Sequence, residues 1–115
     1  MYSGWVEVNF DAGHAPVEDP CPSHPDNPSG HRYRIRAYCT GKYDPTRRPP
    51  LDILRERLTG IRDEFDGQVI DQMMPGSATS PAGIAAYMLE RLGPEASSVR
   101  VMADADAAME VDRRN

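Results

Sequence analysis

Apolar and polar residues alternate along two early stretches of the chain, at 4–10 and 31–40, and this period of two predicts β-strands. One face of the first stretch carries Val6, Val8 and Phe10. One face of the second carries His31, Tyr33, Ile35, Ala37 and Cys39, and the other carries Arg32, Arg34 and Arg36. We expect the arginine row to lie on an outer sheet face, paired with carboxylates across the strands. A surface for an anionic partner is the alternative.

Two later stretches repeat apolar residues at spacings of three and four, which predicts amphipathic helices. The first begins near Pro50 and its buried stripe is Leu51, Leu54, Leu58, Ile61 and Phe65. The second begins after Ser80, a candidate N-cap, and its stripe is Ile84, Ala85, Met88, Leu89 and Leu92. Gly67 and Gly93 are the expected C-terminal caps. Residues 69–79 are expected to be irregular, and further strands are predicted at 98–102 and 108–113.

The predicted order of elements is β-β-α-α-β-β in a single domain over residues 1–115, with a proline-rich loop at 11–30. This order fits an α+β fold in which two helices cover one face of a four-stranded antiparallel sheet. Such a sheet has two open edges, which proteins cover or pair. Pairing these edges between subunits closes a barrel, so we expect a ring-shaped homo-oligomer.

The composition narrows the class of protein. With 39% hydrophobic and 27% charged residues, the chain is of globular type. No apolar run approaches a membrane span and no signal-peptide pattern follows Met1, so we expect a cytoplasmic protein that is not membrane-bound. A net charge of −5 disfavours nucleic-acid binding. The two cysteines, Cys21 and Cys39, are too few for a disulfide-rich scaffold, so free thiols are expected.

Four short motifs follow one another along the chain. They are Phe-Asp-Ala-Gly-His at 10–14, Asn-Pro-Ser-Gly-His-Arg-Tyr at 27–33, Leu-Asp-Ile at 51–53 and Ser-Pro-Ala-Gly-Ile-Ala-Ala-Tyr at 80–87. In this order they resemble motifs of the 6-pyruvoyltetrahydropterin and 6-carboxytetrahydropterin synthases, a family with the tunnelling fold. The resemblance spans nearly the whole chain. It implies zinc-dependent lyase chemistry on dihydroneopterin triphosphate, in a trimer or hexamer around a central barrel.

The resemblance also implies a metal site. Family members bind zinc through three histidines, and His14 and His31 match the first and the last of them. The middle position is Ser29, which is a poor zinc ligand. His24 is the remaining histidine and the candidate replacement, although its spacing also matches the family's catalytic cysteine. The expected cofactor is therefore Zn²⁺ held by His14, His24 and His31.

Catalytic and substrate-binding residues follow from the same resemblance. Cys21 is the candidate for the family's cysteine base, and Asp66 matches the aspartate of its Asp-His pair. Ser80 stands at the start of the helix motif that resembles the family's and is a candidate for substrate binding, although an N-cap role is the simpler explanation. Asp104 lies next to the position of the glutamate that anchors the pterin ring. An acidic group matters there because it accepts two hydrogen bonds from the guanidine-like edge of pterin.

The chain departs from the family pattern at four functional positions, Ser29, Gly67, Ala82 and Ala103. Three hypotheses follow. The first is an active or altered pterin synthase, and the second is a pseudoenzyme that binds a pterin- or purine-like molecule. The third is a structural assembly module. Because functional positions are replaced while the core spacing is kept, we predict that the family reaction is altered or lost.

Overall fold

The computed structural model describes residues 1–13, 30–48, 50–74, 80–104 and 107–113, with the backbone alone at His31, Asp71 and Asp104. It contains four strands and three helices in these residues. The strands are β1 (Tyr2–Gly13), β2 (Gly30–Gly41), β3 (Ser98–Asp104) and β4 (Ala107–Asp112). The helices are α1 (Pro50–Phe65), α2 (Ile70–Met73) and α3 (Pro81–Leu92). None of these helices is long and apolar enough to cross a membrane.

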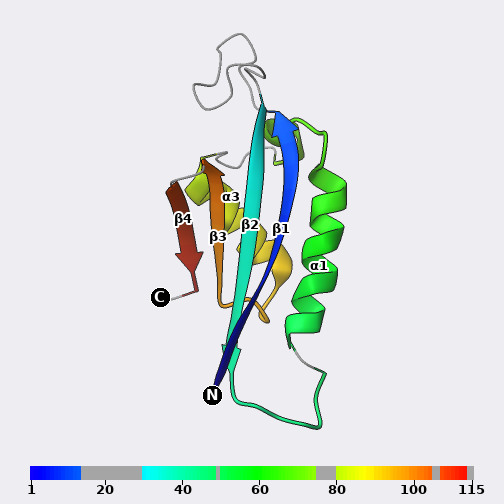
Figure 1. Ribbon diagram of the computed structural model, residues 1–115, viewed down its shortest axis with the longest axis vertical. Helices are drawn as coiled ribbons and strands as arrows, with labels where there is room; N and C mark the ends of the chain where they lie inside the picture. The colour runs from blue at the N-terminus through cyan, green and yellow to red at the C-terminus, as the bar shows by residue number, and fades with distance from the viewer. Residues whose placement is uncertain (14–29, 49, 75–79, 105–106, 114–115) are drawn as a thin grey trace.

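The strands form one antiparallel sheet in the order β1-β2-β3-β4. α1 packs mainly on β1, and α3 packs on β3 and β4. Figure 1 shows both long helices on the same side of the sheet, so its other face is left open by the described residues. The predicted α+β fold, with two helices covering one face of a four-stranded antiparallel sheet, is confirmed.

Several element boundaries differ from the prediction, and β1 already begins at Tyr2. β1 continues to Gly13, so the expected start of the proline-rich loop at residue 11 is wrong. The alternation simply persists, because Ala12 is buried on the same face as Phe10. The stretch expected to be irregular contains the short helix α2, whose first residue, Ile70, and C-cap, Met74, enter the core. β3 extends two residues beyond the expected end, to Asp104.

The core lies between the sheet and the helices and follows the predicted stripes. Leu54, Leu58 and Phe65 of α1 are completely buried, as are Ile84 and Met88 of α3. Burying one such side chain contributes about 1.5–3 kcal/mol. Aromatic rings join the layers: Phe65 contacts Phe10 of β1 at 5.8 Å between ring centroids and Tyr87 of α3 at 6.1 Å.

The predicted caps of the helices are present. Ser80 Oγ accepts a hydrogen bond from Gly83 N at 3.2 Å, with Pro81 at the first helical position of α3. Gly67 and Gly93 have φ angles of +77° and +85°, in the left-handed region that glycine adopts with little cost. Both residues end helices at the positions expected from the sequence.

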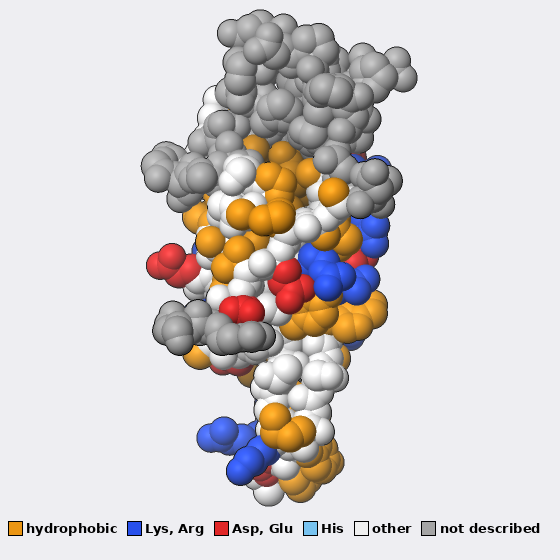
Figure 2. Space-filling model, turned by 90° about the vertical axis from the view of Figure 1, so that its left-hand side faces the viewer, with side chains coloured by type: hydrophobic (Ala, Val, Ile, Leu, Met, Phe, Trp, Pro, Cys, Tyr) orange, Lys and Arg blue, Asp and Glu red, His pale blue; other side chains and the backbone are white. Residues whose placement is uncertain are grey.

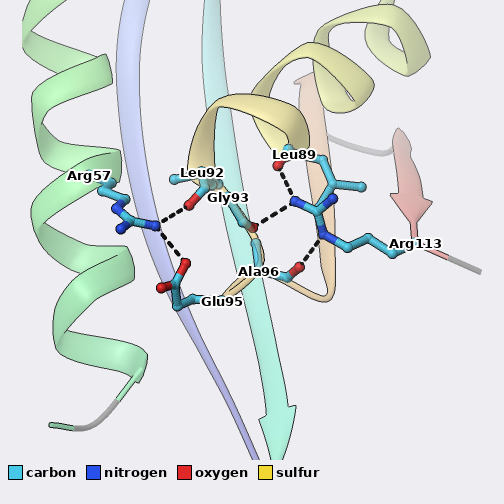
Figure 3. Close-up of polar contacts among 7 residues, drawn as sticks. All are labelled: Arg57, Leu89, Leu92, Gly93, Glu95, Ala96 and Arg113. Atoms are coloured by element: carbon cyan, nitrogen blue, oxygen red, sulfur yellow. Dashed lines mark hydrogen bonds and ion pairs between the residues drawn. The ribbon is translucent and has the colours of Figure 1, made fainter.

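Two arginines bind the carbonyl groups that the end of α3 leaves without helical partners (Figure 3). Arg57 Nη1, from α1, donates to Leu92 O and to Glu95 Oε2, both at 2.6 Å. Arg113, which follows β4, donates through Nε to Ala96 O at 2.7 Å. Its Nη2 donates to Leu89 O and Gly93 O at 2.6 Å each. The end of α3 is thereby tied to both α1 and the last strand.

The open face of the sheet carries the predicted arginine row, and its arginines are paired with carboxylates across the strands. Glu7 lies between Arg36 and Arg34, at 3.0 and 3.5 Å. The remaining pairs are Arg32 with Asp11 and Arg100 with Glu110, each at 3.1 Å. Figure 2 shows basic and acidic side chains next to one another at mid-height. This pairing favours the interpretation as a salt-bridged sheet face over a surface for an anionic partner.

Candidate functional site

One end of the sheet holds several of the predicted site residues that the structure describes. Here β1 ends and β2 begins, with Gly13 paired to Gly30 and Ala12 paired to His31 (the upper end in Figure 1). β3 runs antiparallel to β2, so Asp104 is reached as β3 runs toward the same end. His14 directly follows Gly13 in the sequence. His14, Cys21 and His24 lie outside the described residues.

The segment after α1 is bonded to the end of β1. Gly67 N donates to Asp11 O at 2.7 Å, and Gly13 N donates to Gln68 O at 2.9 Å. Gly13 also forms a parallel bridge with Val69. The positive φ of Gly67 allows the chain to leave α1 and turn directly onto β1. These contacts place Asp66 beside Asp11, two residues before the end of β1.

Asp66 holds a defined local position. Its Oδ1 accepts a hydrogen bond from Asp11 N at 3.0 Å. The neighbouring Arg32 is paired with Asp11 through Nε at 3.1 Å and Nη2 at 3.4 Å. The hydrogen bond and charge of Asp11, with a smaller contribution from Asp66, raise the pKa of Arg32. Asp66 is solvent-exposed, and one of its carboxylate oxygens is already engaged by the backbone.

The other candidates in the described part of the chain are Ser80 and Asp104. Ser80 is an exposed N-cap whose hydroxyl is bonded to its own helix at Gly83, so its substrate role stays a prediction. Asp104 pairs through its backbone with Ala107 at the β3–β4 turn, while its side chain lies outside the described part. The structure therefore brings Asp66 to the end of β1 and gives Ser80 a structural contact.

Cys39 is the free cysteine of the described chain, and it behaves as the predicted small apolar residue. It is buried on the core face of β2, and burial raises the pKa of its thiol. A buried, protonated thiol is a poor nucleophile. If a cysteine acts as a base in this protein, Cys21 is the candidate.

Among the side chains that the structure describes, no three His, Cys, Asp or Glu groups come together as a metal site. The predicted zinc ligands His14, His24 and His31 all have their side chains outside that part of the chain. The Asp11–Arg32 pair and the bond from Asp11 N to Asp66 were not predicted from the sequence. Extending the alternation of β1 by one residue would have placed Asp11 on the same face as Arg32.

Solved structures share this architecture over the whole chain. The 6-pyruvoyl tetrahydropterin synthase of Caenorhabditis elegans aligns with 98% of this chain and 96% of its own, at a TM-score of 0.77 and 17% identity. This chain has the fold of the 6-pyruvoyl tetrahydropterin synthases. The synthase of Plasmodium vivax aligns over 100% of both chains at a TM-score of 0.61 and 14% identity.

An uncharacterised protein of Wolinella succinogenes also aligns with 98% of both chains, at a TM-score of 0.53 and 14% identity. The sequence matches no protein-family model and no curated protein. At these identities the likeness to the synthases establishes the fold. The chain is a strongly diverged version of that architecture.

Proposed function

We propose that this protein is a divergent 6-pyruvoyltetrahydropterin/6-carboxytetrahydropterin synthase-like protein. It keeps the oligomeric scaffold and binds a pterin- or purine-like molecule, and the family's lyase reaction is altered or lost. The observation that carries the proposal is the bonding of Asp66 and Gly67 to Asp11 at the end of β1.

In the synthases that this chain resembles, the aspartate that Asp66 matches works with the histidine that follows it. Here the following residue is Gly67, at φ +77°, with its N–H bonded to Asp11 O. A histidine in that conformation would cost about 1–2 kcal/mol, because a Cβ crowds the left-handed backbone. The turn is therefore built for glycine, and the carboxylate of Asp66 accepts the Asp11 amide. This arrangement supports a change in the proton-transfer chemistry.

A zinc site remains part of the proposal, with His14, His31 and His24 as its ligands. The pairing of Gly13 with Gly30 is compatible with it, because His14 and His31 each directly follow a member of that pair. When bound, zinc polarises a substrate oxygen and acidifies a neighbouring C–H or O–H. Where lyase chemistry survives, we assign Cys21 as the base and Asp66 as the acidic group that orients it. Ser80 and Asp104 are assigned to substrate contacts.

The open edges of the sheet support the proposed oligomer. β1 and β4 are the edge strands, and β1 spans 12 residues. A long edge strand is an aggregation risk unless it is covered or paired. Edge pairing between subunits would satisfy both edges and close the barrel, so we propose a trimer or hexamer. We also propose a cytoplasmic location, which cell fractionation would test.

One preparation tests the proposal. Protein purified without a histidine tag would be measured for native mass, zinc content, neopterin binding and turnover of dihydroneopterin triphosphate. We expect a trimer or hexamer with saturable neopterin binding and no conversion to the synthase products. Full turnover to those products would contradict the proposal that the family reaction is altered or lost. A monomer without neopterin binding would overturn the proposal as a whole.

Variants separate the zinc site from the scaffold. His14→Ala with His31→Ala should abolish zinc binding, while Thr40→Ala, an exposed change at the other end of β2, should leave it intact. Zinc content that ignores the histidine changes would remove the metal site from the proposal. A tight oligomer that binds neither zinc nor neopterin would favour the structural assembly module.

A further inference from the structure

A second candidate site lies at the end of the sheet opposite Asp66. There β1 and β2 extend past β3 and β4, and the chain then loops across to the start of α1 (the lower end in Figure 1). A cleft of about 970 Å³ opens between the start of β1, the end of β2, residues 42–48 and the start of α1. This volume is that of a small-molecule site. The proposal for this cleft is independent of the proposed function above.

The floor of the cleft is apolar. Gly4, Cys39 and Leu51 line it. A Cβ added at Gly4 would meet Leu51 Cδ1 at 3.5 Å and Cys39 Sγ at 3.8 Å, so the missing side chain leaves room above a close-packed base. Tyr2 and the exposed Tyr43 add aromatic rings to the lining. A flat, uncharged ring is the ligand group that such a surface accepts.

The rim is cationic, against the net charge of −5 of the whole chain. Lys42, Arg47 and Arg48 line the cleft within seven sequence positions. Arg48 is paired with Glu56, whereas Arg47 reaches its partner Asp44 only at 4.0 Å and is 84% exposed. Lys42 makes no ion pair with any described residue. Two cationic groups are thus available to an incoming ligand.

The carboxylates in the lining are already engaged. Asp44 Oδ1 accepts hydrogen bonds from Thr46 N at 2.9 Å and Thr46 Oγ1 at 2.7 Å, and these bonds lower its pKa. Glu95 Oε2 accepts a hydrogen bond from Arg57 Nη1 at 2.6 Å. These bonds satisfy much of the carboxylates' demand for partners, and Lys42 and Arg47 are left to attract an anion.

We propose that this cleft binds a small phosphate monoester that carries a flat ring, with AMP as its simplest probe. Lys42 and Arg47 contact the phosphate, because charge-assisted hydrogen bonds from ammonium and guanidinium groups suit phosphate oxygens. Tyr43 packs against the ring. The phosphate contacts are between charged groups at an exposed rim, so binding weakens as the salt concentration rises.

Calorimetry with AMP, adenosine and inorganic phosphate tests the proposal on the full chain. We expect saturable AMP binding, at least about tenfold tighter than adenosine or phosphate alone. Lys42→Glu with Arg47→Glu should weaken AMP binding by about tenfold or more, and Tyr43→Ala by about threefold. Arg55→Glu serves as a single charge-reversal control, since Arg55 is exposed on α1 and does not line this cleft.

Absence of saturable AMP binding would overturn the proposal, as would a loss in Arg55→Glu equal to that in the Lys42 and Arg47 variant. Circular dichroism of each variant checks that it is folded. Neopterin and zinc binding should be unchanged by Lys42→Glu and Arg47→Glu, because the two sites lie at opposite ends of the sheet. A failure here is thereby distinguished from a failure of the proposed function.

Discussion

On the face of the sheet that α1 and α3 cover, Ile35, Val99 and Val101 are completely buried. On the opposite face, the side chains of Arg34, Arg36 and Glu7 remain 43%, 23% and 21% exposed. The same strands supply both faces, because successive residues point to opposite sides. Apolar burial is worth several kcal/mol per side chain, whereas exposed ion pairs are worth about 0–1 kcal/mol each. Side chains on the covered face therefore contribute most of the stability, and substitutions on the open face should cost little.

The largest loss of stability is expected for a substitution on the covered face. Phe65→Ala removes a completely buried ring that contacts Phe10 and Tyr87, and we expect a loss of about 3–5 kcal/mol in the free energy of unfolding. Trp5→Ala on the open face removes a ring that is 51% exposed and stacked under Arg36, and about 1 kcal/mol should be lost. Urea unfolding measures both. Equal losses would break the comparison.

Arg113 tests whether every charged residue contributes little to the free energy of unfolding. Arg113→Ala leaves three carbonyl groups near the end of α3, those of Leu89, Gly93 and Ala96, without this donor. We expect a loss of about 1–3 kcal/mol, because these bonds involve a charged group and partly buried acceptors. Arg55→Ala, on the exposed side of α1, should change stability by less than about 0.5 kcal/mol. An equally small loss of stability for Arg113→Ala would show that water hydrogen-bonds to these carbonyl groups in place of the arginine.

Two glycines sharpen the comparison at positions where side-chain burial plays no part. Gly67 and Gly60 are both exposed, and a Cβ at either position would meet nothing within 4 Å. Gly67→Ala should cost about 1 kcal/mol because its φ is +77°, whereas Gly60→Ala within α1 should gain about 0.5–1 kcal/mol. The midpoint temperature of thermal unfolding should fall for Gly67→Ala and rise for Gly60→Ala. The same sign for both would contradict a conformational cause.

The smallest effect is expected for the ion pairs of the open face. A double-mutant cycle with Arg36→Ala and Glu7→Ala should give a coupling of about 0–1 kcal/mol. Arg34 remains near Glu7 in the first variant and partly replaces the lost partner. The coupling should shrink as NaCl is added, because exposed charges are screened. A coupling that is large and independent of salt would show that this face contributes to the fold as the core does.

Most of the fold could be predicted from periodicity. The stripes of α1 and α3 and the alternation in β2 were correct for the described side chains, with Leu51 only partly buried, because burial of apolar surface dominates each of these elements. The caps at Ser80, Gly67 and Gly93 followed from backbone chemistry. The end of β1 and helix α2 were missed. The alternation of β1 continues through Ala12 and could have been followed further, whereas helix α2 depends on the burial of Ile70, a tertiary contact that no local pattern records.

Less of the candidate site could be predicted. Asp66 was selected by its motif and its catalytic role stays a prediction; its bond to Asp11 N could not be foreseen, since Asp11 was assigned to a loop. The arginine residues that bind the end of α3 were also missed, because Arg57 and Arg113 are far apart in the sequence and have no distinctive motif. The roles of His14, His24, His31 and Cys21 stay predictions.

The connection between β2 and β3 has a consequence for how fast the protein folds. Ser97 bonds to the carbonyl of Tyr38, 59 positions earlier, and the intervening chain contains all three helices. Closing so large a loop has an entropic cost that hairpins β1–β2 and β3–β4 largely avoid. We expect those hairpins to form early and the central pairing to limit the rate. Pulsed hydrogen exchange showing simultaneous protection of all four strands would contradict this order.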